Sequence, residues 1–163
     1  MSSIHYNRQL IIAGLLFTLH NTEEAFGMRY FVRSETLAIH LPAVQQMVPA
    51  IVLITLLAWI AIGWVCTGKN DNTKRFLLTT LLLVFLLNAF IPHILGALYV
   101  CGYFPGVVTS VLLYLPFTYW LLPVTYHAYD SRHSFFVAAG QGICLALLAL
   151  FVTQFASYLL NLL

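Results

Sequence analysis

Charge is what this sequence has least of. Charged side chains make up 7% of its 163 residues, against about a quarter in soluble globular domains, and 61% of its residues are hydrophobic. This composition excludes a soluble globular domain and predicts a chain embedded in a membrane, with membrane lipid as its surroundings. The formal net charge of +2 is also too small to indicate nucleic acid as a partner.

Cysteine is scarce as well, and the chain has no internal repeat, low-complexity tract or long polar stretch. Cys66, Cys101 and Cys144 are widely spaced and form no C-x-x-C pair. We therefore expect free thiols rather than a disulfide framework or a zinc–thiolate site. With no room for a soluble domain, residues 1–163 are expected to form a single transmembrane domain. No small-residue cleavage site follows the first apolar run, so we expect this run to be retained.

What the chain does contain is five apolar runs, each about as long as a helix that crosses a bilayer. The runs cover residues 9–28, 47–67, 75–99, 107–127 and 135–162. The predicted fold class is therefore an all-α membrane protein, a bundle of about five transmembrane helices.

The basic residues predict how this bundle is oriented. Five of them fall on one side of the membrane and two, Arg29 and Arg33, on the other. By the positive-inside rule, the N-terminus is expected in the cytoplasm and the C-terminus on the far side. The localisation expected is a multi-pass protein of the inner or plasma membrane. The five are Arg8, Lys69, Lys74, Arg75 and Arg132.

Polar residues inside the apolar runs predict a site in the outer half of the membrane. His20, Glu23 and Glu24 have the i, i+3, i+4 spacing that puts side chains on one helical face. A carboxylate facing lipid would be unfavourable by about 2.5–3.5 kcal/mol, so this face should point into the bundle. At about 1.5 Å per residue, Asn88 and His93 reach a similar depth on the third run. Pro92 between them predicts a break that can turn both side chains inward.

These residue types suit a membrane-embedded metal-dependent enzyme. Imidazole and carboxylate are ligands of zinc or iron, so His20, Glu24 and His93 are the candidate ligands of a divalent metal. Glu23 is a candidate general base or a residue that orients a ligand, and Asn88 is a further catalytic candidate. The substrate would be an apolar small molecule, such as an isoprenoid or acyl lipid, with hydrolysis and oxidation both chemically open.

Three other interpretations stay open at this point. Without a metal, one of two desolvated glutamates would keep its proton and could serve an isomerase or cyclase as the acid. The polar residues could instead form a proton pathway or bind a small molecule without chemistry, and a protomer of this size could assemble as a homo-oligomer. The blandest alternative is a structural His–Glu bridge, with Asn88 joining two helices.

Three blocks of sequence carry a resemblance to a known family. They are HNTEE at 20–24, NAFIPH at 88–93 and YFPGVVTSVLLYLP at 103–116. In this order they resemble the HXXEE domain family of small integral-membrane proteins, whose members are regarded as enzymes of uncharacterised function. The resemblance implies a site made by residues that these blocks contain: His20, Glu23, Glu24, Asn88 and His93.

Overall fold

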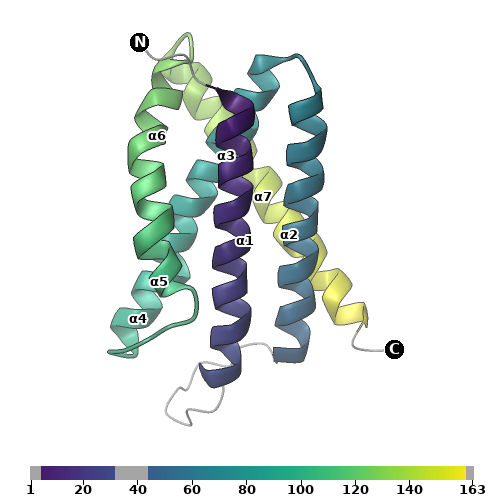
Figure 1. Ribbon diagram of the computed structural model, residues 1–163, viewed down its shortest axis with the longest axis vertical. Helices are drawn as coiled ribbons and strands as arrows, with labels where there is room; N and C mark the ends of the chain where they lie inside the picture. The colour runs from purple at the N-terminus through teal and green to yellow at the C-terminus, as the bar shows by residue number, and fades with distance from the viewer. Residues whose placement is uncertain (1–4, 32–43, 161–163) are drawn as a thin grey trace.

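The computed structural model describes residues 5–31 and 44–160, and within these ranges all regular structure is helical (Figure 1). The all-α bundle of about five long helical stretches is therefore confirmed. The stretches are α1 (Tyr6–Phe31), α2 (Val44–Thr67), α3 (Asp71–Asn88) continued by η1 (Ala89–Ile94) and α4 (Leu95–Tyr99), α5 (Val107–Thr109) continued by η2 (Ser110–Tyr114) and α6 (Leu115–His127), and α7 (Arg132–Leu160).

Four of the five stretches are long and apolar enough to cross a membrane, and α1 is not among them. Its 26 residues suffice in length, but His20, Asn21, Glu23 and Glu24 make its second half polar. Four such spans make the chain a membrane protein. That α1 is the fifth span stays a prediction, and so do the sidedness and the membrane concerned.

The interior of the bundle is organised around α3. This helix packs against α1, α6 and α7, while α2 packs against α1 and α7. Leu10, Leu78, Leu82 and Phe85 are completely buried between these helices. In Figure 1, α1 lies in front of α3, and α7 crosses behind the bundle.

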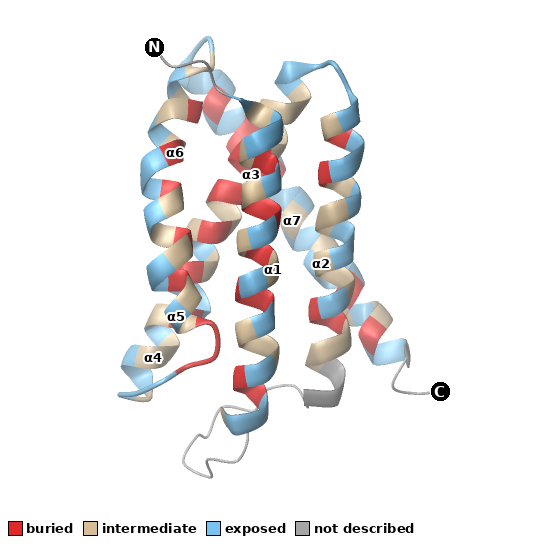
Figure 2. Ribbon diagram, in the orientation of Figure 1, coloured by how far each residue is buried: buried red, intermediate tan, exposed pale blue. Residues whose placement is uncertain are grey.

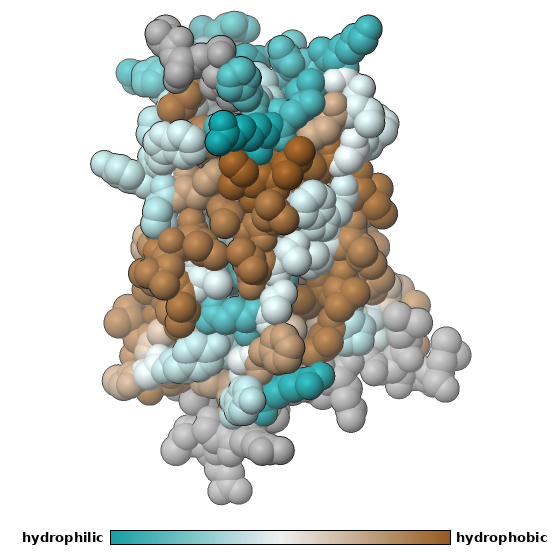
Figure 3. Space-filling view, in the orientation of Figure 1, coloured by the Kyte–Doolittle hydropathy of each residue, from teal (hydrophilic) through white to brown (hydrophobic). Residues whose placement is uncertain are grey.

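The distribution of polar and apolar side chains is that of a membrane protein. Large apolar side chains such as Ile60, Trp64 and Phe151 lie on the outside, each at least two-thirds exposed, whereas Thr79 and Thr125 are completely buried. Figure 2 shows buried residues along the inward faces of the helices, and Figure 3 shows a largely hydrophobic surface around the middle of the molecule. The exposed apolar surface fits contact with lipid chains rather than water.

Two irregular segments interrupt the long stretches on either side of the connection between α4 and α5. In η1, Ile91 leaves the helical region (φ −126°, ψ 111°) directly before Pro92, so the break expected from this proline is confirmed. The other is η2, which forms π-helical turns. The connection ends at Gly106, whose φ of 83° is in the left-handed region that glycine adopts most readily.

Candidate functional site

The polar residues of α1 meet the two irregular segments near the same end of the bundle. α1 supplies His20, Glu23 and Glu24 from one face. Asn88 lies at the end of α3, and His93 in η1 follows the break at Ile91. Because the chain does not continue as a straight helix between them, Asn88 and His93 both reach His20.

His20, Glu24 and His93 form a compact cluster, called here the His/Glu cluster. Each offers one ligand atom, and these three atoms lie within 4.8 Å of one another. The His20 Nε2 atom is 3.9 Å from Glu24 Oε2, and the two imidazole rings are 4.6 Å apart between centroids. The structure thus brings together the three residues expected to hold a metal.

One ring nitrogen of His93 is hydrogen-bonded, and the other has no partner among the described residues. Its Nδ1–H donates to the carbonyl oxygen of Pro105 at 2.5 Å, so the lone pair resides on Nε2. The Nε2 atom is buried and has no hydrogen-bond partner among the described residues. A buried nitrogen lone pair without a partner is unfavourable unless a ligand satisfies it.

Gly106 makes room for both imidazoles. A Cβ atom at this position would lie 2.5 Å from His93 Cε1 and 2.9 Å from His20 Cε1, closer than van der Waals contact permits. Position 106 therefore needs glycine for two reasons, its positive φ and the space that the histidine rings occupy.

His20 is completely buried, and both of its ring nitrogens have partners. Asn88 Nδ2 lies 3.0 Å from Nε2, and Thr109 Oγ1 lies 2.9 Å from Nδ1. The ring also packs on the buried Tyr114, whose ring in turn stacks on Phe85 at 3.9 Å between centroids. Asn88 thus contacts a member of the cluster and joins two helices in doing so.

The carboxylate of Glu23 points toward the start of α5. Its carboxylate accepts hydrogen bonds from the backbone N–H groups of Val108 (3.2 Å) and Thr109 (2.8 Å). The hydroxyl of Thr109 (2.5 Å) and the phenol of Tyr103 (3.2 Å) donate to it as well. Four donors and the positive end of the helical stretch that begins at α5 stabilise the negative charge of Glu23.

The charge of Glu23 also acts on the connection between α4 and α5. Burial, followed by the negative charge of Glu23 and the hydrogen bond to it, raises the pKa of Tyr103 to about 12. Tyr103 therefore remains a hydrogen-bond donor over the whole physiological pH range.

Glu24, by contrast, has no comparable set of donors within residues 5–31 and 44–160. Among the described residues, its one ion-pair contact is His20 Nε2, and its side chain is 17% exposed. Neighbouring carboxylates in a dry environment disfavour each other's charge. Hydrogen-bond donors of the protein thus stabilise the negative charge of Glu23. A negative charge on Glu24 would need a ligand in the His/Glu cluster to stabilise it.

Two further hydroxyls lie buried on η2 without partners among the described residues. They belong to Ser110 and to Tyr114, one turn later, whose ring contacts His20. The stacking of the Tyr114 ring on Phe85 also gives this residue a role in packing. The hydroxyl of Thr55 in α2, by contrast, accepts a hydrogen bond from Asn21 (2.6 Å) and joins α2 to α1.

Sequence reasoning missed three contributors to the site: Thr109, the Pro105 carbonyl and Gly106. Hydroxyls are common in membrane helices, and nothing in the spacing connects Thr109 with Glu23, 86 residues earlier. The available signal was the Pro-Gly pair just before the fourth apolar run, because such a pair predicts a turn and a helix start at which backbone N–H groups are free.

Comparison with known proteins agrees with the motif. No curated protein and no solved structure matches the chain. The model of a family described as proteins of unknown function with an HXXEE motif matches residues 11–121. This range is more than half of the chain and includes His20, Glu23, Glu24, Asn88 and His93. The chain therefore belongs to the HXXEE family.

Proposed function

We propose that the chain is a membrane-embedded, metal-dependent enzyme that acts on a lipid-like substrate through the His/Glu cluster. One observation carries the proposal. The Nδ1 atoms of His20 and His93 are each engaged with an oxygen atom, and His20 Nε2 lies 3.9 Å from Glu24 Oε2. One ligand atom from each of His20, Glu24 and His93 lies within 4.8 Å of the other two. Histidines that bind metals commonly have one nitrogen bonded to an oxygen acceptor and the other on the metal.

The donor set fits zinc or iron. Two imidazole nitrogens and one carboxylate are a common set for catalytic zinc and for non-haem iron, and both leave positions for water or substrate. His20 Nε2, Glu24 and His93 Nε2 would hold the ion. The ion would then take the place of Asn88 as the partner of His20 Nε2. When bound, such an ion would polarise a substrate oxygen or lower the pKa of a water molecule.

The other residues have roles that follow from their contacts. Glu23, fully engaged with Thr109, Val108 and Tyr103, is suited to orienting the site rather than to accepting a proton from substrate. Asn88, once released from Nε2, has an amide free to hold a polar group of the substrate. The buried hydroxyl of Tyr114 is a second group of this kind.

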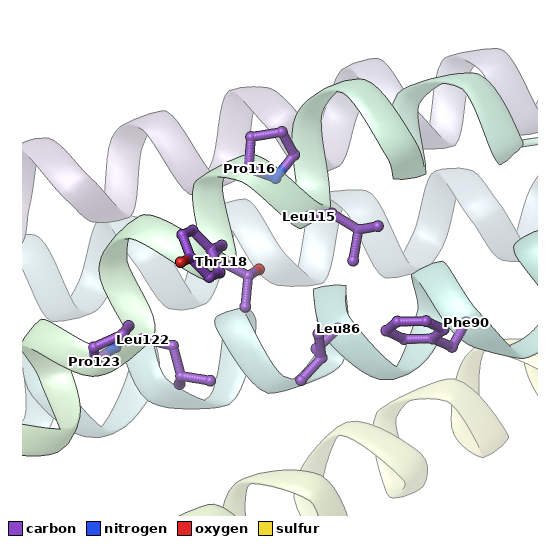
Figure 4. Close-up of a pocket in the computed structure, with 8 residues that line it drawn as sticks. Leu86, Phe90, Leu115, Pro116, Thr118, Leu122 and Pro123 are labelled. Atoms are coloured by element: carbon purple, nitrogen blue, oxygen red, sulfur yellow. The ribbon is translucent and has the colours of Figure 1, made fainter.

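An apolar groove supports the substrate class. It has a volume of about 580 Å³, within the range of ligand sites, and lies between α3 and α6 (Figure 4). On both helices its lining includes sequence neighbours of residues that contact His20, since Phe90 is two residues after Asn88 and Leu115 follows Tyr114. A hydrocarbon chain fits such walls. The lining residues are Leu86, Phe90, Leu115, Pro116, Thr118, Tyr119, Leu122 and Pro123.

Metal analysis tests the proposal. The protein is purified in a metal-poor detergent after growth with zinc and iron, and its metal content is measured per chain. We expect about one zinc or iron ion, lost in His93→Ala and retained in His133→Ala, a histidine exposed at the start of α7. A chain without metal would refute the proposal. Metal retained in His93→Ala would show that another site binds it.

A further inference from the structure

Thr109 hydrogen-bonds to both the histidine and the first glutamate of the HXXEE motif. Its hydroxyl oxygen is 2.5 Å from Glu23 Oε2 and 2.9 Å from His20 Nδ1, and its backbone N–H donates to the same Glu23 oxygen at 2.8 Å. Glu23 and His20 are on one helix, but the hydroxyl that joins them comes from another stretch of the bundle.

The direction of these hydrogen bonds follows from a count of the protons available. An ionised carboxylate can only accept, so the Thr109 hydroxyl must donate its single proton to Glu23. The other acceptor near this hydroxyl is the Gly106 carbonyl, at 3.4 Å, and is too distant to compete. Since the proton of Thr109 is committed, its oxygen accepts from His20, and His20 Nδ1 must carry a hydrogen.

The second nitrogen of His20 agrees with this assignment. With the proton on Nδ1, Nε2 of the neutral ring has a lone pair, which is the acceptor that Asn88 Nδ2 needs at 3.0 Å. That lone pair lies 3.9 Å from Glu24 Oε2, on the side of the ring that belongs to the His/Glu cluster. Glu23 thus acts on His20 without touching it.

We infer that Thr109 is a positioning residue, which transmits the charge of Glu23 to His20 and holds this imidazole in the Nδ1–H form, with the lone pair on Nε2 available to a ligand that displaces Asn88. The inference rests on the proposed function only in naming a metal as that ligand. The tautomer is a property of the protein without metal. The two glutamates of the motif accordingly have different tasks. Glu23 acts on His20 through the Thr109 hydroxyl, and Glu24 is the proposed metal ligand.

The tautomer can be measured directly. Nitrogen-15 NMR of histidine-labelled, metal-free protein in detergent distinguishes Nδ1–H from Nε2–H, and the His20 signal is assigned by its loss in His20→Gln. We expect Nδ1–H in the parent protein and in Thr109→Ser, which keeps the hydroxyl. Thr109→Val should give a mixture or the Nε2–H form. Glu23→Gln should shift His20 the same way, because an amide carries no charge and can turn its N–H group toward the Thr109 hydroxyl, which then no longer has to donate to residue 23.

Zinc titration and a matched control complete the test. Thr109→Val should bind Zn²⁺ about 10–100-fold more weakly than the parent protein, as loss of a partner behind a metal ligand typically does, and Thr109→Ser should restore binding. Thr22→Val, which removes a hydroxyl bonded to its own helix beside Glu23, should change neither readout.

The outcomes separate the inference from the proposed function. If His20 remains Nδ1–H in both Thr109→Val and Glu23→Gln, Thr109 does not set the tautomer and the inference is wrong. The same holds if Thr22→Val has an equal effect. If the tautomer shifts as expected while the parent protein binds no Zn²⁺, the inference stands and the metal proposal fails. Should Thr109→Val not fold, Glu23→Gln alone decides.

Discussion

Glu23 and Glu24 are adjacent in sequence, yet their carboxylates lie in different surroundings. Glu23 accepts hydrogen bonds from two backbone N–H groups and two hydroxyls at the start of α5. Among the described residues, Glu24 lies beside His20 Nε2 with no such donors, in a cluster where His93 Nε2 also lacks a partner. A negative charge and an unsatisfied lone pair at one place are both stabilised by a cation.

The first prediction concerns Glu24→Gln. The variant should lose Zn²⁺ affinity by more than about 100-fold, since loss of a partner behind a ligand already reduces affinity by about 10–100-fold. Its metal-free form should be as stable as the parent protein or more so, because an amide is easier to bury than a carboxylate. Zinc titration and thermal unfolding measure the two effects. Unchanged affinity would exclude Glu24 as a ligand.

A second prediction concerns the space beside the two histidines. Gly106→Ala places a Cβ atom against both rings and puts alanine at a φ of 83°. The left-handed conformation alone is unfavourable by about 1–2 kcal/mol for a residue with a Cβ atom. We expect a lower unfolding temperature together with weaker Zn²⁺ binding. Gly63→Ala, at a position with open space around it, is the control and should retain metal binding.

Tyr103 provides a prediction on pH. Its folded-state pKa of about 12 is above the ordinary value of 10, so the folded protein holds this proton more tightly than the unfolded chain. Its contribution to stability is complete below about pH 10 and is lost as the pH rises through about 12. The difference in tyrosinate absorbance between the parent protein and Tyr103→Phe should show one group titrating near pH 12. A midpoint near 10 would contradict the burial of this phenol and its contact with Glu23.

At the scale of the helices, the break in η1 determines which side chains reach the cluster. On a straight helix, Asn88 and His93 would point about 140° apart. The non-helical φ and ψ of Ile91 change this relation, so that Asn88 bonds to His20 and the His93 ring lies 4.6 Å from the His20 ring.

Pro92→Ala should therefore weaken metal binding without unfolding the bundle. An alanine restores the backbone N–H that proline lacks and allows the regular helix that would turn Asn88 or His93 away. We expect Zn²⁺ affinity to fall about 10–100-fold, the range seen when metal ligands lose their supporting contacts. The helix content measured by circular dichroism should stay constant. Pro123→Ala, within α6, is the matched control. Equal affinities for the two variants would contradict this role of the break.

The sequence predicts helices well and contacts between distant segments poorly, for a physical reason. Apolar runs determine where helices can lie in a membrane, and the i, i+3, i+4 spacing of His20, Glu23 and Glu24 determines a shared face. Pro92 even indicated the break. However, no local rule relates Glu23 to the free N–H groups of Val108 and Thr109, because that contact depends on how two helices pack. The partner of Glu23, and hence its difference from Glu24, was visible only in three dimensions.

At the scale of the whole molecule, one exposed residue at each end of the bundle allows its orientation in the membrane to be tested. Cys101 is exposed at the end where α4 and α5 meet, and Asp130 is exposed at the other end, between α6 and α7. The basic residues predict that the Asp130 end is cytoplasmic. In a chain with Cys66 and Cys144 replaced by serine, an impermeant maleimide should label Cys101 on intact cells. With Cys101 replaced as well, Asp130→Cys should react only after permeabilisation. The reverse pattern would overturn the predicted orientation.

The contact between Glu23 and α5 has a consequence for biogenesis. Thr109 is made 86 residues after Glu23, which at about 5–20 residues per second is a delay of roughly 4–17 s. During that interval α1, the least apolar of the five long stretches, carries Glu23 before its hydrogen-bond donors exist and Glu24 before His93 completes the His/Glu cluster. Leaving α1 alone in lipid would be unfavourable by about 2.5–3.5 kcal/mol for each charged carboxylate. We therefore expect α1 to wait beside the insertion machinery until residues 107–127 arrive, so that a segment made late completes the insertion of one made early.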